Sequence, residues 1–307
     1  YRVGFGSQSE VWIRFGCAPR VSTGSDLQVM FCELRDATAA VIADLRYNTV
    51  TGVIEARVGS SQIATSGAAH FAVAGANEQW HAIEIHYVPS NSAGVLEVYL
   101  DGVRVINIQP GDTIDTTIGQ ENVAYLTLGF ARSATGSNQD RNSFDDLAIN
   151  SPAGSRNNGR VGQGGIVALV PNGVGDSTDW SRGGSDSGSN HGQVDEIPPN
   201  DGTDYVVGSA DGDLDLYEAS NLPGSGEPLR IDAITVLARA QLDSGSGIAF
   251  RTVVKSGEEE VESGDHVLDS TWRFFPEQLL EADPDGGGSW TRTKVNALQI
   301  GVKTTEA

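Results

Sequence analysis

The sequence offers few residues whose types and spacing could catalyse a reaction. Hydrolysis of a glycosidic bond takes two carboxyl groups that flank the bond, and the nearest pair in this chain is Glu33 and Asp36. Their spacing of three residues places them on opposite faces of a strand, because successive side chains alternate. We therefore interpret both as ordinary surface acids.

Motifs for nucleophilic catalysis and for dinucleotide binding are also absent. No Gly-x-Ser-x-Gly turn occurs, and the glycine pairs Gly162/Gly164 and Gly173/Gly175 lack the third glycine of a dinucleotide-binding loop. The sequence therefore predicts no catalytic residue, no bound organic cofactor and no enzymatic activity.

The five histidines do not indicate a metal site. His81 and His86 are five residues apart in a predicted strand, which puts them on opposite faces. His70, His191 and His266 are scattered along the chain. We expect each to be solvated or at the edge of a core.

Acidic clusters are the one place where a metal ion could bind. Asp211, Asp213 and Asp215 alternate in the manner of a calcium loop, and calcium prefers several carboxylate oxygens. The same spacing also describes a strand with one solvated face, and no glutamate at the twelfth position completes an EF-hand. Asp145 and Asp146 form a similar pair. Calcium binding therefore stays an open alternative, and the identity of any bound metal is unknown.

Tryptophan side chains can stack on sugar rings. Trp180 and Trp290 lie in polar, glycine-rich surroundings and are the candidates for such a contact, although anchoring a loop is the alternative for both. Trp12, Trp80 and Trp272 lie in predicted strands, and we expect them in the core.

A β-hairpin from Trp80 to Ile106 organises the first half of the chain. Apolar and polar residues alternate on both sides of the turn at residues 89–94, and Asp101-Gly102 turns the chain again. Further strands are predicted at regular spacing, which is typical of an all-β sandwich. They are residues 10–15, 27–34, 39–46, 53–58, 61–65, 124–130 and 143–150.

The second half is predicted to be another β-sandwich. Residues 151–165 have the composition of a linker, so we place the domains at 1–158 and 159–307. A buried strand is expected at 166–170, a long polar loop at 176–204, and a hairpin from 231–242 to 248–255. Residues 291–298 predict a helical turn capped by Thr291 or Thr293, followed by a last strand at 299–303.

The charge of the chain argues against two classes of partner. A net charge of −21 makes nucleic acid a poor partner. No apolar run approaches the roughly 18 residues that a membrane span requires, so we expect no membrane insertion.

Only three of the basic residues are lysines, at 255, 294 and 303. An acidic, lysine-poor surface suits a saline, halophilic setting, whereas an arginine-favouring genome explains it equally well. A melting temperature that stays constant between low and multimolar salt would contradict the saline hypothesis.

The two cysteines are not expected to form a disulfide. If residues 11–17 and 27–34 are antiparallel neighbours, Cys17 and Cys32 lie at opposite ends of the pair and are too far apart to bond.

The first half resembles the laminin-G and concanavalin A-like jelly rolls. The resemblance rests on Trp80-His81, the hairpin, Asp101-Gly102 and the closing strand Phe144-Asp145-Asp146-Leu147-Ala148-Ile149. The chain starts at Tyr1 without Met, and the resemblance implies a further sandwich strand before it.

The whole chain resembles a group of structural proteins of tailed viruses. The resemblance rests on an ordered set of motifs in the second half. They are residues 167–173, 175–180, 194–201, 203–206, 283–284, 290–291 and 295–302.

This resemblance implies a virion protein displayed on the capsid, as a decoration, turret or fibre, or carried on the tail. It also implies a homo-oligomer that contacts other virion proteins and could contact host-surface glycans. A secreted carbohydrate-binding or adhesion module is the alternative. A glycan hydrolase is disfavoured by the missing carboxylate pair.

Overall fold

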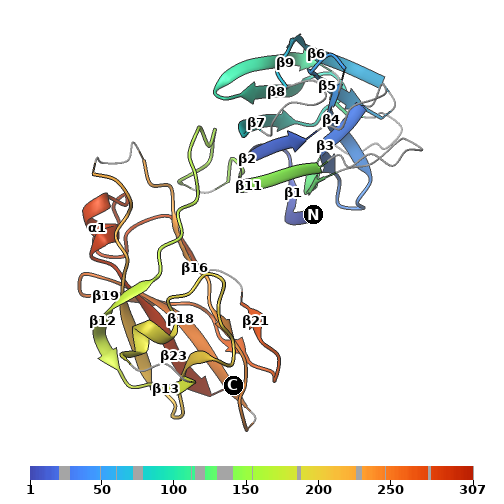
Figure 1. Ribbon diagram of the computed structural model, residues 1–307. Helices are drawn as coiled ribbons and strands as arrows, with labels where there is room; N and C mark the ends of the chain where they lie inside the picture. The colour runs from blue at the N-terminus through green and yellow to red at the C-terminus, as the bar shows by residue number, and fades with distance from the viewer. Residues whose placement is uncertain are drawn as a thin grey trace. The chain divides into compact units, whose positions relative to one another are not determined.

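The structure is a computed structural model of the 307-residue chain. It describes all residues except 21–27, 49, 60, 72–78, 112, 115–121, 130–140, 154, 185–187, 226–229, 246, 276–277 and 307. The chain divides into two compact units, Tyr1–Ile166 and Val167–Ala307, which we describe separately (Figure 1). This division lies C-terminal to the boundary predicted at Asn158.

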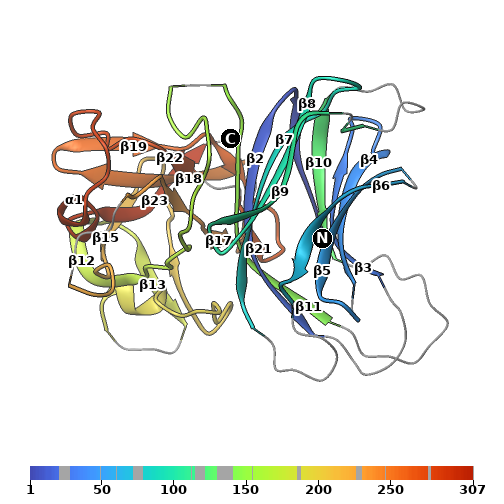
Figure 2. The same cartoon turned by 90° about the horizontal axis from the view of Figure 1, so that it is seen from above.

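Two antiparallel sheets make up the first unit, and they form separate layers in Figure 2. The five-stranded sheet has the order β11 (Arg141–Asn150), β2 (Val11–Arg20), β7 (His81–Val88), β8 (Gly94–Leu100), β9 (Val103–Gly111). The six-stranded sheet has the order β1 (Arg2–Gln8), β10 (Val123–Leu128), β3 (Gln28–Arg35), β4 (Val41–Asn48), β5 (Val53–Val58), β6 (Ser61–Ala69).

The core of this unit consists of the side chains that point inward from each strand, which alternate with the outward-pointing ones. Ile83, Ile85 and Tyr87 of β7 are buried against residues such as Phe31 and Leu45 from the other sheet. Burying a large apolar side chain contributes about 1.5–3 kcal/mol, so this shared core is what holds the two layers together. The prediction of an all-β, jelly-roll sandwich is confirmed.

The central hairpin also forms as predicted. Ile85 pairs with Val98 across β7 and β8, and the turn into β9 has positive φ at Asp101 (50°) and Gly102 (83°). Glycine adopts this backbone conformation without strain, and aspartate tolerates it better than most residues.

Two details of the first unit differ from the sequence-based expectation. β2 and β3 are not neighbours, because β2 pairs with β7 and β11 while β3 pairs with β4 and β10. β1, which we did not predict, pairs with β10. Strand alternation specifies which face is buried, but it does not specify the sheet to which a strand belongs.

The cysteines are free and buried in this core. Burial raises the pKa of Cys17 to about 12 and raises that of Cys32 well above its usual value. Both thiols therefore stay protonated and unreactive at neutral pH.

The second unit is built on a six-stranded sheet and three two-stranded sheets. The large sheet has the order β12 (Pro171–Thr178), β15 (Leu214–Ala219), β23 (Gln299–Glu306), β18 (Ile248–Ser256), β19 (Glu259–Glu262), with β20 (His266–Val267) also on β18. The small sheets pair β13 (Ser181–Gly184) with β14 (Asp204–Val207), β16 (Ile234–Val236) with β22 (Gln278–Leu280), and β17 (Arg239–Ala240) with β21 (Arg273–Phe274). The helices are η1 (Asn190–Gln193) and α1 (Arg292–Asn296).

A smaller apolar core joins these parts. Val236 of β16, Val254 of β18 and Trp290 are buried together, with Val295 of α1 beside them. Thr291 caps α1, since its side chain accepts a hydrogen bond from the Lys294 amide. The predicted helical turn and the last strand are thus confirmed.

Three expectations for this unit are wrong. Residues 231–242 do not form a hairpin with β18, because β16 and β17 pair with β22 and β21. Residues 166–170 form no strand, and Ile166 is 66% exposed. The polar stretch 176–204 contains β13 and η1. Short apolar runs are ambiguous without their tertiary partners.

Neither helix in the described part of the chain is long enough to cross a membrane.

Candidate functional site

The outward face of the five-stranded sheet carries an unusual set of aromatic and charged side chains. Strand register places Trp12 beside His86 and His86 beside Glu97. The next row contains Arg14, Glu84 and Tyr99. These residues alternate with the core residues of β2, β7 and β8, so the same pattern that builds the core presents them on the opposite face.

His86 lies at the centre of a charged network. Its Nδ1 is 3.1 Å from Glu97 Oε2, its Nε2 is 2.7 Å from Glu10 Oε1, and its ring stacks on Trp12 at 4.7 Å between centroids. Arg104 donates to the other oxygen of Glu97 at 2.6 Å. Burial acts to raise the pKa of Glu97, but the hydrogen bonds from Arg104 and His86 outweigh it and lower that pKa. Glu97 is therefore a fixed anion.

Residues 159–166, which we call the strap, lie on this face and are fastened to it. Arg160 donates two hydrogen bonds to the buried carboxylate of Glu84, at 2.9 and 2.8 Å, and the Gly162 amide donates a third at 3.0 Å. The Arg160 guanidinium also lies 3.9 Å above the centre of the Tyr99 ring.

Two further contacts hold the ends of the strap. Asn150 donates to the Gly159 carbonyl at 3.0 Å, and the Ile166 amide donates to Asp146 Oδ1 at 2.6 Å. The composition of residues 151–165 predicted a linker, but residues 159–166 are part of the first unit. Glycine-rich composition could not show this, because Glu84, which anchors the strap through Arg160, lies 76 positions earlier in the chain.

A small pocket remains between the strap and the sheet. Its polar and aromatic lining includes Trp12, Glu84, His86, Glu97, Tyr99 and Arg160. Glu84 and Arg160 are already paired, as are His86 and Glu97, so the charged groups of this pocket hold one another in place. Sequence reasoning missed Arg160 because its partner is not local.

Trp80 lies on the same outward face and is 56% exposed. A Cβ built on Gly16 of β2 would be 3.4 Å from Cε3 and 3.5 Å from Cζ3 of its ring, so the indole lies against this glycine. The prediction that Trp80 is a core residue is wrong. It precedes β7, and its side chain covers β2 from the outside.

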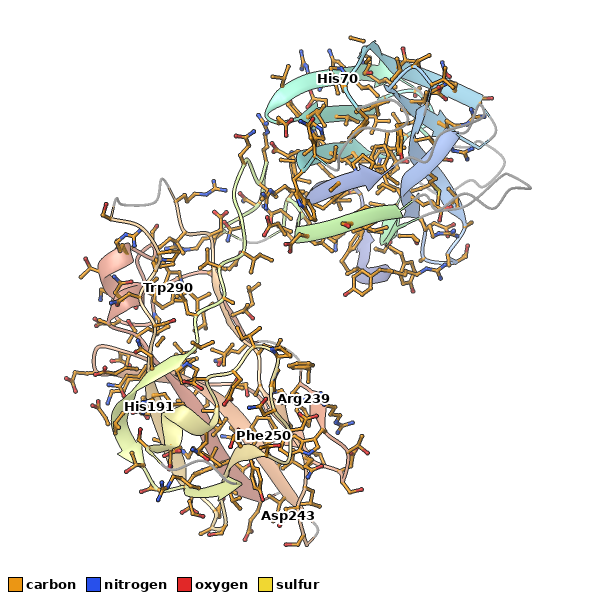
Figure 3. The ribbon with its side chains drawn as sticks, viewed as in Figure 1. His70, His191, Arg239, Asp243, Phe250 and Trp290 are labelled. Atoms are coloured by element: carbon orange, nitrogen blue, oxygen red, sulfur yellow. The ribbon has the colours of Figure 1, made fainter. Side chains whose placement is uncertain are left out.

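The other tryptophans also fall in unexpected places. Trp290 is 3% exposed and donates to the Leu280 carbonyl at 2.9 Å, so this candidate for sugar stacking is a core residue next to α1 (Figure 3). Trp180 is partly exposed and donates to the Asp213 carbonyl at 3.0 Å, which fits the anchoring alternative. Trp12 and Trp272 are partly exposed and do not belong to the described cores.

A ladder of acids and arginines lies on the six-stranded sheet of the first unit. Glu33 and Arg35, Asp44 and Arg46, and Glu55 and Arg57 each form an acid-x-Arg triplet on β3, β4 and β5. The acids are 4–8% exposed, and each lies within 4.0 Å of the arginine two residues later. Register places Glu33 opposite Asp44 and Arg46 opposite Glu55.

This ladder corrects the interpretation of Glu33 and Asp36 as surface acids. Glu33 pairs with Arg35, and Asp36, which is 1% exposed, accepts hydrogen bonds from the Thr38 and Ala40 amides in the β3–β4 turn. The signal was present in the sequence, since the triplets recur every eleven residues at 33, 44 and 55.

The aspartates from 211 to 215 do not converge on a common point. Asp211 Oδ1 accepts from the Glu306 amide, Asp213 Oδ2 from the Ala210 amide, and Asp215 Oδ2 from Tyr217. Asp145 and Asp146 do not converge on a common point either, since Asp146 is held by Arg14 and the Ile166 amide. Within the described residues no group of three or more His, Cys, Asp or Glu side chains could hold a metal ion.

Asp215 is fully buried, and no positively charged side chain of the described residues pairs with it. Its Oδ2 accepts from the Tyr217 hydroxyl at 2.7 Å and from Asn190 of η1 at 2.8 Å. Burial, the largest effect, raises the pKa of this carboxyl group despite these hydrogen bonds.

The histidines lie apart, as their spacing predicted. His81 Nδ1 is 2.8 Å from Asp101, on the face opposite to His86. His191, labelled in Figure 3, is part of η1, and its ring forms a hydrogen bond with the Ser189 hydroxyl. His266 packs against Phe250, and burial lowers its pKa.

Comparisons with known proteins place the chain only at the level of fold. No family model matches it, and no curated protein matches it. Solved structures with some likeness include an alginate lyase Aly36B mutant in complex with alginate trisaccharide, at 10% identity and a TM-score of 0.36, covering 48% of this chain and 73% of that one. A sialidase (14%, TM-score 0.33, covering 49% and 14%) and an ancestral congerin (13%, TM-score 0.24, covering 47% and 99%) are also similar.

These comparisons correct one sequence-based prediction. We predicted that the chain is not an enzyme, and this prediction is withdrawn, because the similar structures include alginate lyases and a sialidase. The absence of the expected carboxylate pair is therefore no evidence against enzymatic activity in a jelly roll. At these identities the likeness concerns the fold alone and assigns no reaction to this chain.

Arg160→Ala should release the strap. The substitution leaves Glu84 buried without its ionic partner, which is strongly unfavourable. We expect faster hydrogen exchange at the amides of residues 159–166. Arg104→Ala is the matched control, since Arg104 is equally exposed (45% against 44%) and also pairs with a carboxylate of this sheet. Equal exchange of the strap in both variants would contradict the assignment.

Asp215→Asn should make the second unit less sensitive to pH. The pKa of Asp215 is raised in the folded state, so its contribution to stability is full below the unfolded pKa and is lost as pH rises through the folded pKa. Thermal unfolding from about pH 4 to about pH 8 should therefore show a smaller loss of stability in the variant. Asp211→Asn, at the exposed start of the same motif, should behave like the unsubstituted chain.

Proposed function

We propose that the chain is a structural component of the particle of a tailed virus, displayed on the capsid or carried on the tail. The observation that supports this proposal is the ordered set of motifs between residues 167 and 302. These motifs all fall in the second unit.

Several motif residues have defined roles in that unit. Trp290 fills the core, Thr291 caps α1, and Asn296 accepts a hydrogen bond from the Leu222 amide at 2.9 Å. Gly301 is required by space, since a Cβ there would be 1.9 Å from the Asp215 carbonyl oxygen. The motifs therefore specify one folded module, which is why their shared order supports a shared role.

Exposed apolar residues on the second unit support assembly. Leu237, Phe274 and Leu279 are each more than half exposed and lie in or next to the small paired sheets β16–β22 and β17–β21. Exposed apolar side chains that lie near one another favour a protein interface. In this proposal they contact other copies of the chain or neighbouring virion proteins, while the first unit contacts host-surface glycans.

A secreted carbohydrate-binding or adhesion module is the second candidate. It rests on the exposed indole of Trp80, because an exposed aromatic surface suits a glycan-binding protein.

Location separates the two candidates. Antibodies against the purified chain should label tailed particles from the source culture, and quantitative mass spectrometry of those particles should give a copy number that matches capsid or tail symmetry. Absence from purified particles, with the chain found free in the medium, would contradict the virion proposal and favour the secreted module.

A further inference from the structure

We propose that Trp80 and Asp145 form a binding site for a neutral sugar ring on the outward face of the five-stranded sheet. This site would make the glycan contact of the proposed function, and the source of the glycan rests on that proposal. The location of the chain on a particle is tested independently.

The indole of Trp80 provides a flat apolar surface. One part of the ring lies against Gly16, where no side chain intervenes, and 56% of the residue remains exposed. The C–H groups on one face of a pyranose are apolar, and they can pack on an aromatic face of this size and exclude water from both.

Asp145 supplies a hydrogen-bond acceptor on the same face of the sheet, opposite the glycine that the indole covers. It pairs with Gly16 in the register of β11 and β2, so its side chain is on the same face as the glycine under the indole. The residue is exposed, and its Oδ1 accepts from the Asp146 amide at 2.7 Å. This bond orients the carboxylate, and its other oxygen can accept from a sugar hydroxyl.

The backbone at this point departs from regular strand geometry. The register of β11 shifts between Asp145 and Ala148, and Asp146 has a φ of 55°. Such bulges re-aim a side chain, and a non-glycine residue at positive φ is kept only where its surroundings hold it. Arg14 and the Ile166 amide hold Asp146 here.

These observations distinguish Trp80 from an ordinary exposed apolar residue. Single exposed hydrophobic side chains are common and need no function. Val103 of the same sheet, which is 66% exposed, is an example of such a residue. At Trp80, an aromatic face and an oriented carboxylate occur together.

Charge selects a neutral ligand. The chain carries a net charge of −21, and the site itself contains the Asp145 carboxylate. Two arginines of this face are already paired, Arg14 with Asp146 and Arg160 with Glu84. A uronate or sialate would therefore meet repulsion without a compensating ion pair, whereas hydroxyl groups can donate to Asp145.

Binding should be measured on the full chain with neutral oligosaccharides of glucose, galactose and mannose, and with alginate oligomers and sialyllactose as acidic probes. Saturation-transfer NMR detects the contact and calorimetry gives the affinity. We expect at least one neutral series to bind, and Trp80→Ala to weaken that binding about tenfold or more. Trp80→Phe, which keeps an aromatic face, should retain most of it.

Asp145→Asn should weaken binding less than Trp80→Ala, because an amide oxygen still accepts a hydrogen bond. Val103→Ala is the matched control for loss of exposed apolar surface and should change nothing. The proposal is overturned if no neutral series binds, if acidic probes bind better than neutral ones, or if affinity is the same in Trp80→Ala and Val103→Ala. None of these outcomes would alter the presence of the chain in particles.

Discussion

The pairing of one buried carboxylate determines how the outward face of the first unit is arranged. Glu84 is 3% exposed on a sheet face that would ordinarily meet water. A buried charge without a partner is strongly destabilising, and Arg160 with the Gly162 amide supplies three hydrogen bonds to it. This requirement draws residues 159–166 back onto the sheet. The path of the strap, the pocket beneath it and the point where the chain leaves the unit, at Ile166 beside Asp146, all follow from it.

Charged side chains find their partners in different ways on the two outward faces of the sandwich. On the six-stranded sheet, each acid of the ladder finds an arginine on its own strand, two residues away. On the five-stranded sheet, the partners come from other strands or from the strap. Local pairs stabilise a strand wherever it lies, whereas distant pairs exist only once the fold has formed. The five-stranded face, with its exposed indole and its covered pocket, is therefore the one shaped by tertiary structure.

Sequence reasoning worked where the physical signal was local. The hairpin around residues 89–93 and the cap at Thr291 depend on alternation, turn residues and side-chain hydrogen bonds within a few positions. It failed where a short segment had several possible pairing partners. Residues 231–242 have the composition of one long strand, yet they divide into two short strands that pair elsewhere. The tryptophans were misplaced for the same reason, since exposure depends on what covers a side chain.

The sequence by itself determined the fold class, because alternating apolar residues and frequent turn residues leave few ways other than a β-sandwich to bury the apolar face. It also determined the acidic character and the repeated acid-x-Arg triplets. Only the tertiary structure decided which strands share a sheet and that Trp290 is buried while Trp80 is exposed. It alone placed Arg160 on Glu84 and Asp145 beside Gly16. The physical reason is that these contacts join residues far apart in the chain, and no local pattern encodes the partner of a side chain that lies a hundred positions away.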